Sequence, residues 1–154
     1  VRQGDLMYDN WLANSVVVVA TFAAVCLCSL IHYEGLSLLA RGLARHPAHQ
    51  PRRKVLYGIF AILALHIVEI WLFGLTYWLL LLWPETGSVA SAHPAGLLDS
   101  VYLSAMTYTT VGFGDLAPLG PVRFLSGTEA LTGFVMITWS ASFTYLEMER
   151  FWRR

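Results

Sequence analysis

The chain has 154 residues, of which 56% are hydrophobic and only 13% are charged. A water-soluble surface needs more polar residues than this, so the composition predicts a membrane protein and excludes an ordinary soluble domain. Ten basic and ten acidic residues give a formal net charge of zero. This balance gives no reason to expect nucleic acid, or a strongly charged protein, as a partner. The length suits a single domain.

Three apolar segments, residues 11–31, 55–83 and 124–146, are predicted to cross a membrane as helices. About 20 helical residues are enough to span the roughly 30 Å hydrocarbon layer. The second segment is longer than a vertical helix needs, so we expect it to tilt or to begin in the interface. The first segment is too long for the apolar part of a secretory signal peptide, and we expect it to remain as a span.

A short apolar helix is expected at residues 97–109, between the second and third spans, with Asp99 or Ser100 as a possible cap. About twelve helical residues cover only about 18 Å, which is too short to cross the membrane. This helix must therefore be interfacial, re-entrant or buried in protein.

Positive charge in the segment 41–54 predicts the orientation of the chain. This segment contains five basic residues and no acidic one: Arg41, Arg45, Arg52, Arg53 and Lys54. Because basic loops remain in the cytoplasm, the segment is expected inside the cell. The N-terminus and residues 84–121 then lie outside, and the C-terminus lies in the cytoplasm.

Directly after the short helix, residues 109–115 read Thr-Thr-Val-Gly-Phe-Gly-Asp. Glycine adopts backbone angles that other residues avoid, so alternating glycines allow successive carbonyl groups to point toward one side. Irregular backbone at membrane depth is tolerated only where it is buried in protein or lines a water-filled path. A row of carbonyl oxygens in such a place can replace the water around a cation.

Residues 110–115 resemble the selectivity filter of tetrameric potassium channels, and the flanking helices fit the same family. The resemblance implies an all-α membrane protein with three transmembrane helices, a re-entrant pore helix and a filter loop. Residues 1–54 would hold the first transmembrane helix and the basic linker, and residues 55–154 the pore module. Within the module the resemblance implies an outer helix (55–83), a turret (84–96), a pore helix (97–109), a filter (110–115) and an inner helix (122–147). One filter segment per chain implies a homotetramer, with three identical subunits as partners.

The resemblance also assigns roles to the filter residues. The carbonyls of Thr110, Val111, Gly112 and Phe113, with the Thr110 hydroxyl, would coordinate K⁺, and Gly114 would complete the filter. Asp115 at the outer mouth would raise the local cation concentration. The implied function is passive, K⁺-selective conduction through the plasma membrane of a prokaryote, without enzymatic activity and without a cofactor other than bound K⁺.

Three features depart from the family pattern. Phe113 replaces a commoner tyrosine, which removes a phenol that could brace the filter. Met106 occupies a place where some relatives have a carboxylic acid, so Asp115 is expected to lack that partner. Some relatives have a pair of aromatic residues in the pore helix, and this chain has only Tyr102 in their place.

The third span contains a possible hinge at Gly133, where the inner helix could bend. The alternative is that Gly133 allows close helix packing. In either case Ile137 and Ala141, at four-residue steps from Gly133, are expected to line the central cavity.

Ionisable residues within the spans need partners or water. Glu69 and His66 are three residues apart and are expected on one helix face, where they can bond to each other. Glu129 is expected behind the pore helix, as a pH-sensitive group or as a structural carboxyl. His32 and Glu34 are expected at the membrane interface.

Three other functions remain open at this stage: a non-selective cation channel, a non-conducting regulatory subunit and a helical-bundle metalloprotein. The metalloprotein would use His32, Glu34, His66 and Glu69, but di-iron bundles need two Glu-x-x-His pairs and this chain has one pair in reversed order. No span has regularly spaced arginines, so a voltage sensor is not expected. The few residues after the third span suggest no ligand-binding module.

Overall fold

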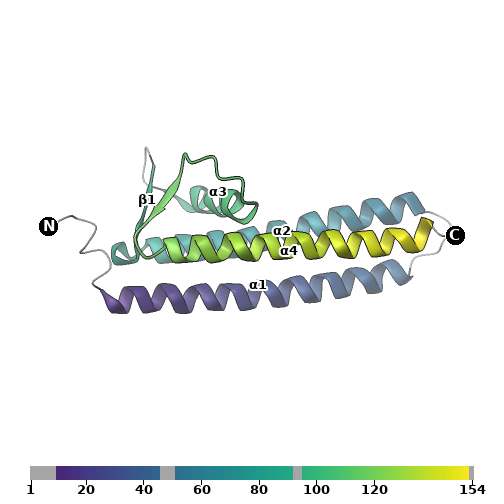
Figure 1. The fold of residues 1–154 in the computed structure, drawn as a ribbon, viewed down its shortest axis with the longest axis horizontal. Helices are drawn as coiled ribbons and strands as arrows, with labels where there is room; N and C mark the ends of the chain where they lie inside the picture. The colour runs from purple at the N-terminus through teal and green to yellow at the C-terminus, as the bar shows by residue number, and fades with distance from the viewer. Residues whose placement is uncertain (1–9, 46–50, 92–94, 153–154) are drawn as a thin grey trace.

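The computed structural model describes residues 10–45, 51–91 and 95–152. Four α-helices make up most of it: α1 (Trp11–Arg45), α2 (Pro51–Leu81), α3 (Leu97–Tyr108) and α4 (Arg123–Trp152). The three long helices lie side by side, and the short α3 packs against α2 and α4 at one end (Figure 1). α1 begins at the end that contains α3, whereas α4 finishes at the opposite end.

The long helices have 35, 31 and 30 residues, more than the apolar segments of the sequence predicted. At 1.5 Å per residue each is about 45 to 52 Å long. The extra turns lie at the basic end, where Arg41 belongs to α1 and Lys54 to α2. Leucine, alanine, arginine and lysine all favour helix, so the helices continue beyond the apolar segments into the expected linker.

Two of these helices, α1 and α2, are long and apolar enough to be candidate membrane spans. The third expected span, α4, does not reach the same hydropathy, because serine and threonine are frequent along it. Several of its hydroxyls donate to the carbonyl four residues earlier, as Thr132 does to Thr128 and Ser142 to Thr138. These bonds satisfy the hydroxyls within the helix itself.

A small antiparallel sheet joins the segment before α3 to the segment after the filter residues. It consists of β1 (Ser88–Ala90) and β2 (Ala117–Leu119), with Val89 opposite Pro118. A 3₁₀ turn, Pro84–Thr86, precedes it, and the Thr86 carbonyl accepts from the Val122 amide at 2.9 Å. The expected all-α fold class is confirmed, and the two strands were not expected because strands of three residues have no readable periodicity.

The start of α3 also differs from the expected cap. Gly96 is the N-cap residue, and its amide donates to the Asp99 carboxylate at 2.8 Å. Asp99 thus acts from the third helical position, where a carboxylate is favourable near the helix N-terminus. Tyr108 ends the helix and Thr109 follows as its C-cap.

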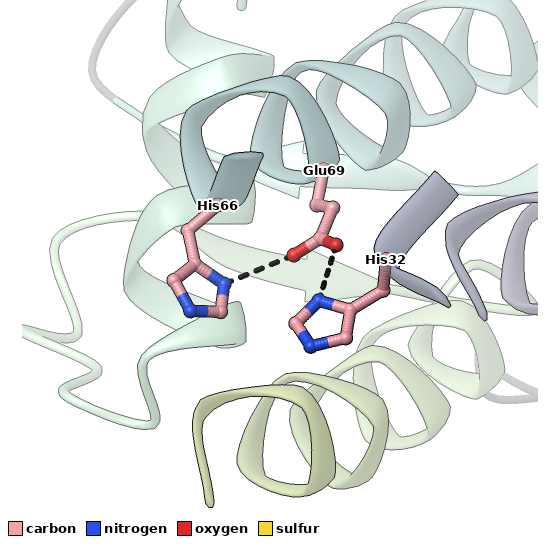
Figure 2. Close-up of side chains that lie close together, drawn as sticks. All are labelled: His32, His66 and Glu69. Carbon is pink, nitrogen blue, oxygen red and sulfur yellow. Dashed lines mark hydrogen bonds and ion pairs between the residues drawn. The ribbon is translucent and has the colours of Figure 1, made fainter. Parts of the chain in front are cut away.

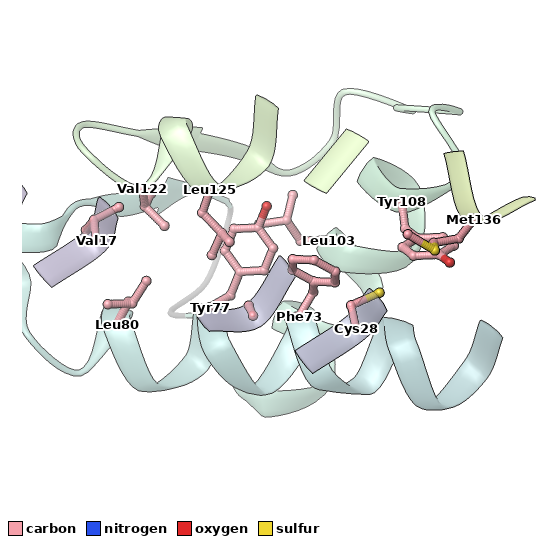
Figure 3. Close-up of a cluster of buried hydrophobic side chains, with 11 residues drawn as sticks. Val17, Cys28, Phe73, Tyr77, Leu80, Leu103, Tyr108, Val122, Leu125 and Met136 are labelled. Carbon is pink, nitrogen blue, oxygen red and sulfur yellow. The ribbon is translucent and has the colours of Figure 1, made fainter. Parts of the chain in front are cut away.

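Buried apolar side chains fill the space where α3 meets the long helices (Figure 3). Phe73 and Tyr77 of α2 lie among Leu103 of α3 and Leu125 of α4, and all four are almost completely buried. The backbones of α2 and α3 approach closely, because a Cβ atom on Gly74 would lie 2.7 Å from the Val101 Cα. This packing fixes α3, and with it the loop that follows.

Candidate functional site

The loop that resembles a selectivity filter begins where α3 ends. The Thr110 amide donates to the Thr107 carbonyl at 2.9 Å, and the Gly112 amide donates to the Met106 carbonyl at 3.2 Å. These two bonds turn the chain back alongside the last turn of α3. The C-terminal end of a helix carries partial negative charge, so the loop starts in a place that favours cations.

Every second residue of the loop has a left-handed backbone conformation. The φ angles are 60° at Thr110, 52° at Gly112 and 81° at Gly114, whereas Val111 and Phe113 are not in this region. Thr110 is the one non-glycine residue with positive φ in the described parts of the chain. Alternation between residues of negative and positive φ allows successive carbonyls to point to one side of the chain, whereas they alternate between two sides in a regular strand.

Within the single chain, the need for glycine in the loop is conformational and not steric. Nothing lies within 4 Å of a Cβ atom built on Gly112 or on Gly114. The cost of a side chain there comes from the left-handed backbone, which is about 1 to 2 kcal/mol for an L-residue.

One side of the loop is open in the single chain. Residues 109–115 are all exposed, and the apolar side chains of Val111 and Phe113 are 55% and 71% exposed. Behind the loop is a hollow of about 210 Å³, whose walls include Tyr102, Met106 and Phe113. Large apolar side chains are thus exposed together on an irregular loop.

The last residue of the loop, Asp115, has a partner that the sequence analysis missed. The Tyr102 hydroxyl donates to Asp115 Oδ2 at 2.9 Å. Met106 has no carboxylic acid group to bond to Asp115. The phenol of Tyr102, one turn earlier in α3, bonds to the Asp115 carboxylate instead. The bond ties the end of the loop to the middle of α3.

Glu129 of α4 is fully buried against α3. Its Oε1 lies 2.5 Å from the Ser104 hydroxyl, which is also 2.9 Å from the Ile70 carbonyl of α2. Glu129 Oε2 and the Tyr77 hydroxyl are buried without a hydrogen-bond partner among the described residues. Ser104 therefore joins three helices through a single hydroxyl.

Four polar side chains meet between α1, α2 and the end of α3. His32 Nδ1 lies 2.7 Å from Glu69 Oε1, and His66 Nδ1 lies 3.0 Å from Glu69 Oε2 (Figure 2). The Tyr108 hydroxyl donates to Glu69 Oε2 at 2.5 Å and is 3.0 Å from His66 Nδ1. We call these four residues the His–Glu cluster.

The expectation that His32 marks the membrane interface was wrong, because its side chain is fully buried. Glu34, its companion in that expectation, is exposed. The sequence did contain the signal for His32. It lies four residues from Cys28 and four from Leu36, within a buried stripe that runs along α1 at spacings of three and four.

Gly133 of α4 lies against the last residue of α3. A Cβ atom on Gly133 would lie 2.1 Å from the Tyr108 carbonyl oxygen, so a glycine is needed there for close packing. Ile137 and Ala141 are exposed on the single chain and line an open cleft of about 460 Å³ between α2 and α4.

Comparison with known proteins gives matches over the same part of the chain. A model described as ion channel matches residues 65–146, which is more than half of the sequence. Protein LctB of Geobacillus stearothermophilus is 43% identical over 53 residues, 34% of this chain and 40% of LctB. Protein LctB of Bacillus caldotenax is 42% identical with the same coverage.

The inward rectifier potassium channel Kirbac3.1 of Paramagnetospirillum magnetotacticum is 33% identical over 63 residues, 40% of this chain and 21% of that protein. The matched part of the chain spans two fifths or less of the length of these relatives. No solved structure matches the chain significantly. The matches confirm the resemblance to the pore module of prokaryotic-type potassium channels. The chain belongs to the ion channel family, which is not a class of enzymes.

Proposed function

We propose that four copies of this chain form a potassium-selective channel, in which residues 110–115 of each copy make one quarter of the filter. The observation that carries this proposal is the left-handed backbone at Thr110, Gly112 and Gly114, on a loop that begins at the C-terminal end of α3. Backbone of this kind can direct a column of carbonyl oxygens toward one axis.

Each residue of the loop then has a chemical role. The carbonyls of Thr110, Val111, Gly112 and Phe113 replace the hydration shell of K⁺, and the Thr110 hydroxyl adds the innermost ligand. Asp115, held by Tyr102, places negative charge at the outer mouth and attracts cations. Conduction is passive and needs no cofactor.

The exposed side chains of the loop support assembly into a homotetramer. Lipid cannot cover the exposed side of the loop, because unpaired backbone groups are not tolerated in hydrocarbon. Further apolar side chains are exposed on α4: Leu131, Phe134 and Val135. Three more copies of the chain would cover the loop and this helix, and would close the ring around the ion path.

In this assembly α1, α2 and α4 all cross the membrane. The backbone-bonded hydroxyls of α4 reduce the cost of placing a polar helix there. The end where α1 finishes and α2 begins carries Arg41, Arg53 and Lys54, so it faces the cytoplasm. The start of α1 and the filter loop then face outward, and the resemblance to small prokaryotic channels supports the plasma membrane as the location.

Liposomes that contain the purified protein test this proposal. With K⁺ as the permeant ion we expect flux that barium blocks, and with Na⁺ as the permeant ion we expect almost none. Chemical cross-linking in the same liposomes should stop at four subunits. Equal K⁺ and Na⁺ flux would support a non-selective channel, and no flux from protein that is correctly assembled would support a regulatory subunit.

The non-selective alternative has one observation in its favour. Phe113 has no hydroxyl to brace the filter, and a hollow of about 210 Å³ lies beside it. A filter that flexes here would discriminate less between cations of different size. The ratio of K⁺ to Na⁺ flux decides between the two functions.

A further inference from the structure

The His–Glu cluster contains a set of atoms that is suited to binding a metal ion. His32, His66 and Glu69 each offer one ligand atom, and these atoms all lie within 4.8 Å of one another. The three side chains come from two helices and point toward one another (Figure 2). Nothing in the proposed conduction mechanism uses them.

Burial makes a cation at this position favourable. Glu69 and His32 are fully buried, and the cluster lies beside the apolar core of the helices. An ionised carboxylate without a compensating positive charge is costly in such surroundings. Either a proton shared with an imidazole or a bound metal ion can supply that charge.

We propose that His32 Nδ1, His66 Nδ1 and one Glu69 carboxylate oxygen bind a divalent transition metal ion, with Zn²⁺ as the best fit. Two imidazoles and one carboxylate are a ligand set that zinc uses in proteins. Atoms bound to tetrahedral zinc lie about 3.3 Å apart, since each bond is about 2.0 to 2.2 Å long. The 2.7 Å and 3.0 Å contacts join the two histidines to different oxygens of Glu69, and the ligand atoms lie within 4.8 Å of one another. A shift of the side chains would therefore bring both ring nitrogens and one oxygen to this spacing.

Two further contacts hold the ligands in place. The Tyr108 hydroxyl donates to Glu69 Oε2, and the Ser140 hydroxyl lies 3.4 Å from His32 Nε2, the ring nitrogen that would face away from the metal. Partners of this kind orient the ligands of natural metal sites and usually add to the affinity. Because Ser140 belongs to α4, the site involves side chains from all four helices.

The site also has a route for entry. The His66 side chain is 15% exposed and, with Ser140, lines the open cleft between α2 and α4. An ion that enters from this side meets His66 first, and the same side leaves room for water as a fourth ligand. A bound ion would join α1 to α2 next to Tyr108, two residues before the filter loop begins.

This site differs from the di-iron arrangement considered from the sequence. That arrangement needs several carboxylates, whereas the cluster contains one, and Glu34 is exposed outside it. One metal ion bound by three protein ligands is the expected composition.

Cobalt gives a direct test on the unaltered protein in detergent, with any purification tag removed. Addition of Co²⁺ should produce the visible absorption bands of a four-coordinate ion, and Zn²⁺ should remove them at a stoichiometry of one ion per chain. Zn²⁺ should also raise the Tm. If Co²⁺ gives no such bands and Zn²⁺ does not bind by calorimetry, the cluster is a hydrogen-bonded network and the proposal is wrong.

Variants then locate the site. His32→Gln and Glu69→Gln should abolish the cobalt bands, and Ser140→Ala should weaken Zn²⁺ binding about 10-fold through loss of the outer contact. Glu34 is exposed and lies outside the cluster. The control variant Glu34→Gln should therefore bind Co²⁺ and Zn²⁺ as the original chain does. If His32→Gln folds and still gives the full cobalt spectrum, His32 is not a ligand.

The chain has five histidines, and the remaining three, His46, His49 and His93, lie outside the described residues. A variant with all three replaced by glutamine must retain the cobalt bands. Loss of the bands in this variant would assign the metal to those histidines and overturn the proposal. The cobalt spectrum and calorimetry both measure metal binding to the chain. A failure of ion selectivity in the flux assay would therefore leave this test unaffected.

Discussion

Gly133 of α4 lies so close to Tyr108 of α3 that a Cβ atom would lie 2.1 Å from the Tyr108 carbonyl oxygen. Tyr108 is also the residue whose hydroxyl bonds to Glu69, and the filter loop begins two residues later. The packing of α4 and the position of the loop are therefore linked through one residue.

The first prediction concerns this contact. Gly133→Ala should force α4 away from α3 and lower the free energy of unfolding by about 1 to 3 kcal/mol, the usual cost of overpacking. K⁺ flux should fall with it. The control is Gly58→Ala in α2, where nothing lies within 4 Å of the added Cβ atom. Denaturant unfolding in detergent measures both variants, and equal stability of the two would contradict the close contact.

The second prediction separates backbone conformation from space at Gly112. Replacement by L-alanine should cost about 1 to 2 kcal/mol of conformational energy in the loop and should abolish K⁺ flux, because φ there is 52°. Replacement by D-alanine, introduced by semisynthesis, should retain flux, because a D-residue favours positive φ. Equal flux from the two forms would show that handedness at Gly112 does not matter.

The third prediction tests the charge at the filter mouth. Asp115→Asn should reduce K⁺ flux several-fold at low salt, because the exposed carboxylate attracts cations over about 10 Å at 0.1 M ionic strength. The difference should disappear near 1 M salt, where screening acts within about 3 Å. Tyr102→Phe is the matched control, since it removes the bond to Asp115 but retains the charge. Salt dependence in Tyr102→Phe should therefore match the original chain.

The fourth prediction follows from counting hydrogens around Ser104. Its hydroxyl has one hydrogen but contacts both the Ile70 carbonyl and Glu129 Oε1. Both contacts are satisfied if Ser104 donates to Ile70 and Glu129 carries its own proton. Glutamine can donate in the same way, so Glu129→Gln should change the free energy of unfolding by less than about 1 kcal/mol.

Flux through Glu129→Gln should then keep the pH dependence of the original chain, which is the behaviour of a structural carboxyl. A changed pH response in a stably folded variant would instead identify Glu129 as a pH sensor. This measurement decides between the two roles that the sequence left open.

The sequence predicted the elements whose signal is long or specific. The apolar segments predicted three long helices, and the alternating Gly112 and Gly114 identified the loop after the short helix, because glycine is needed where the backbone is left-handed. The sequence could not predict the left-handed conformation of Thr110, because threonine has no preference for positive φ.

Sequence patterns did not predict the contacts between segments that are far apart in the chain. The Tyr102 bond to Asp115 and the approach of His32 to Glu69 depend on how helices pack, and a single sequence does not encode which faces meet. The strands β1 and β2 are too short to leave a pattern. Helix ends were misjudged at the basic side, because polar residues can continue a helix after the apolar segment stops.

Current through purified channels in a planar bilayer, with K⁺ on one side and Na⁺ at equal concentration on the other, tests the central claim most directly. If the carbonyls of residues 110–113 select K⁺, the reversal potential shifts strongly from zero in the direction of K⁺ permeability. A reversal potential at zero, from channels that barium blocks poorly, would contradict a potassium-selective filter in this protein.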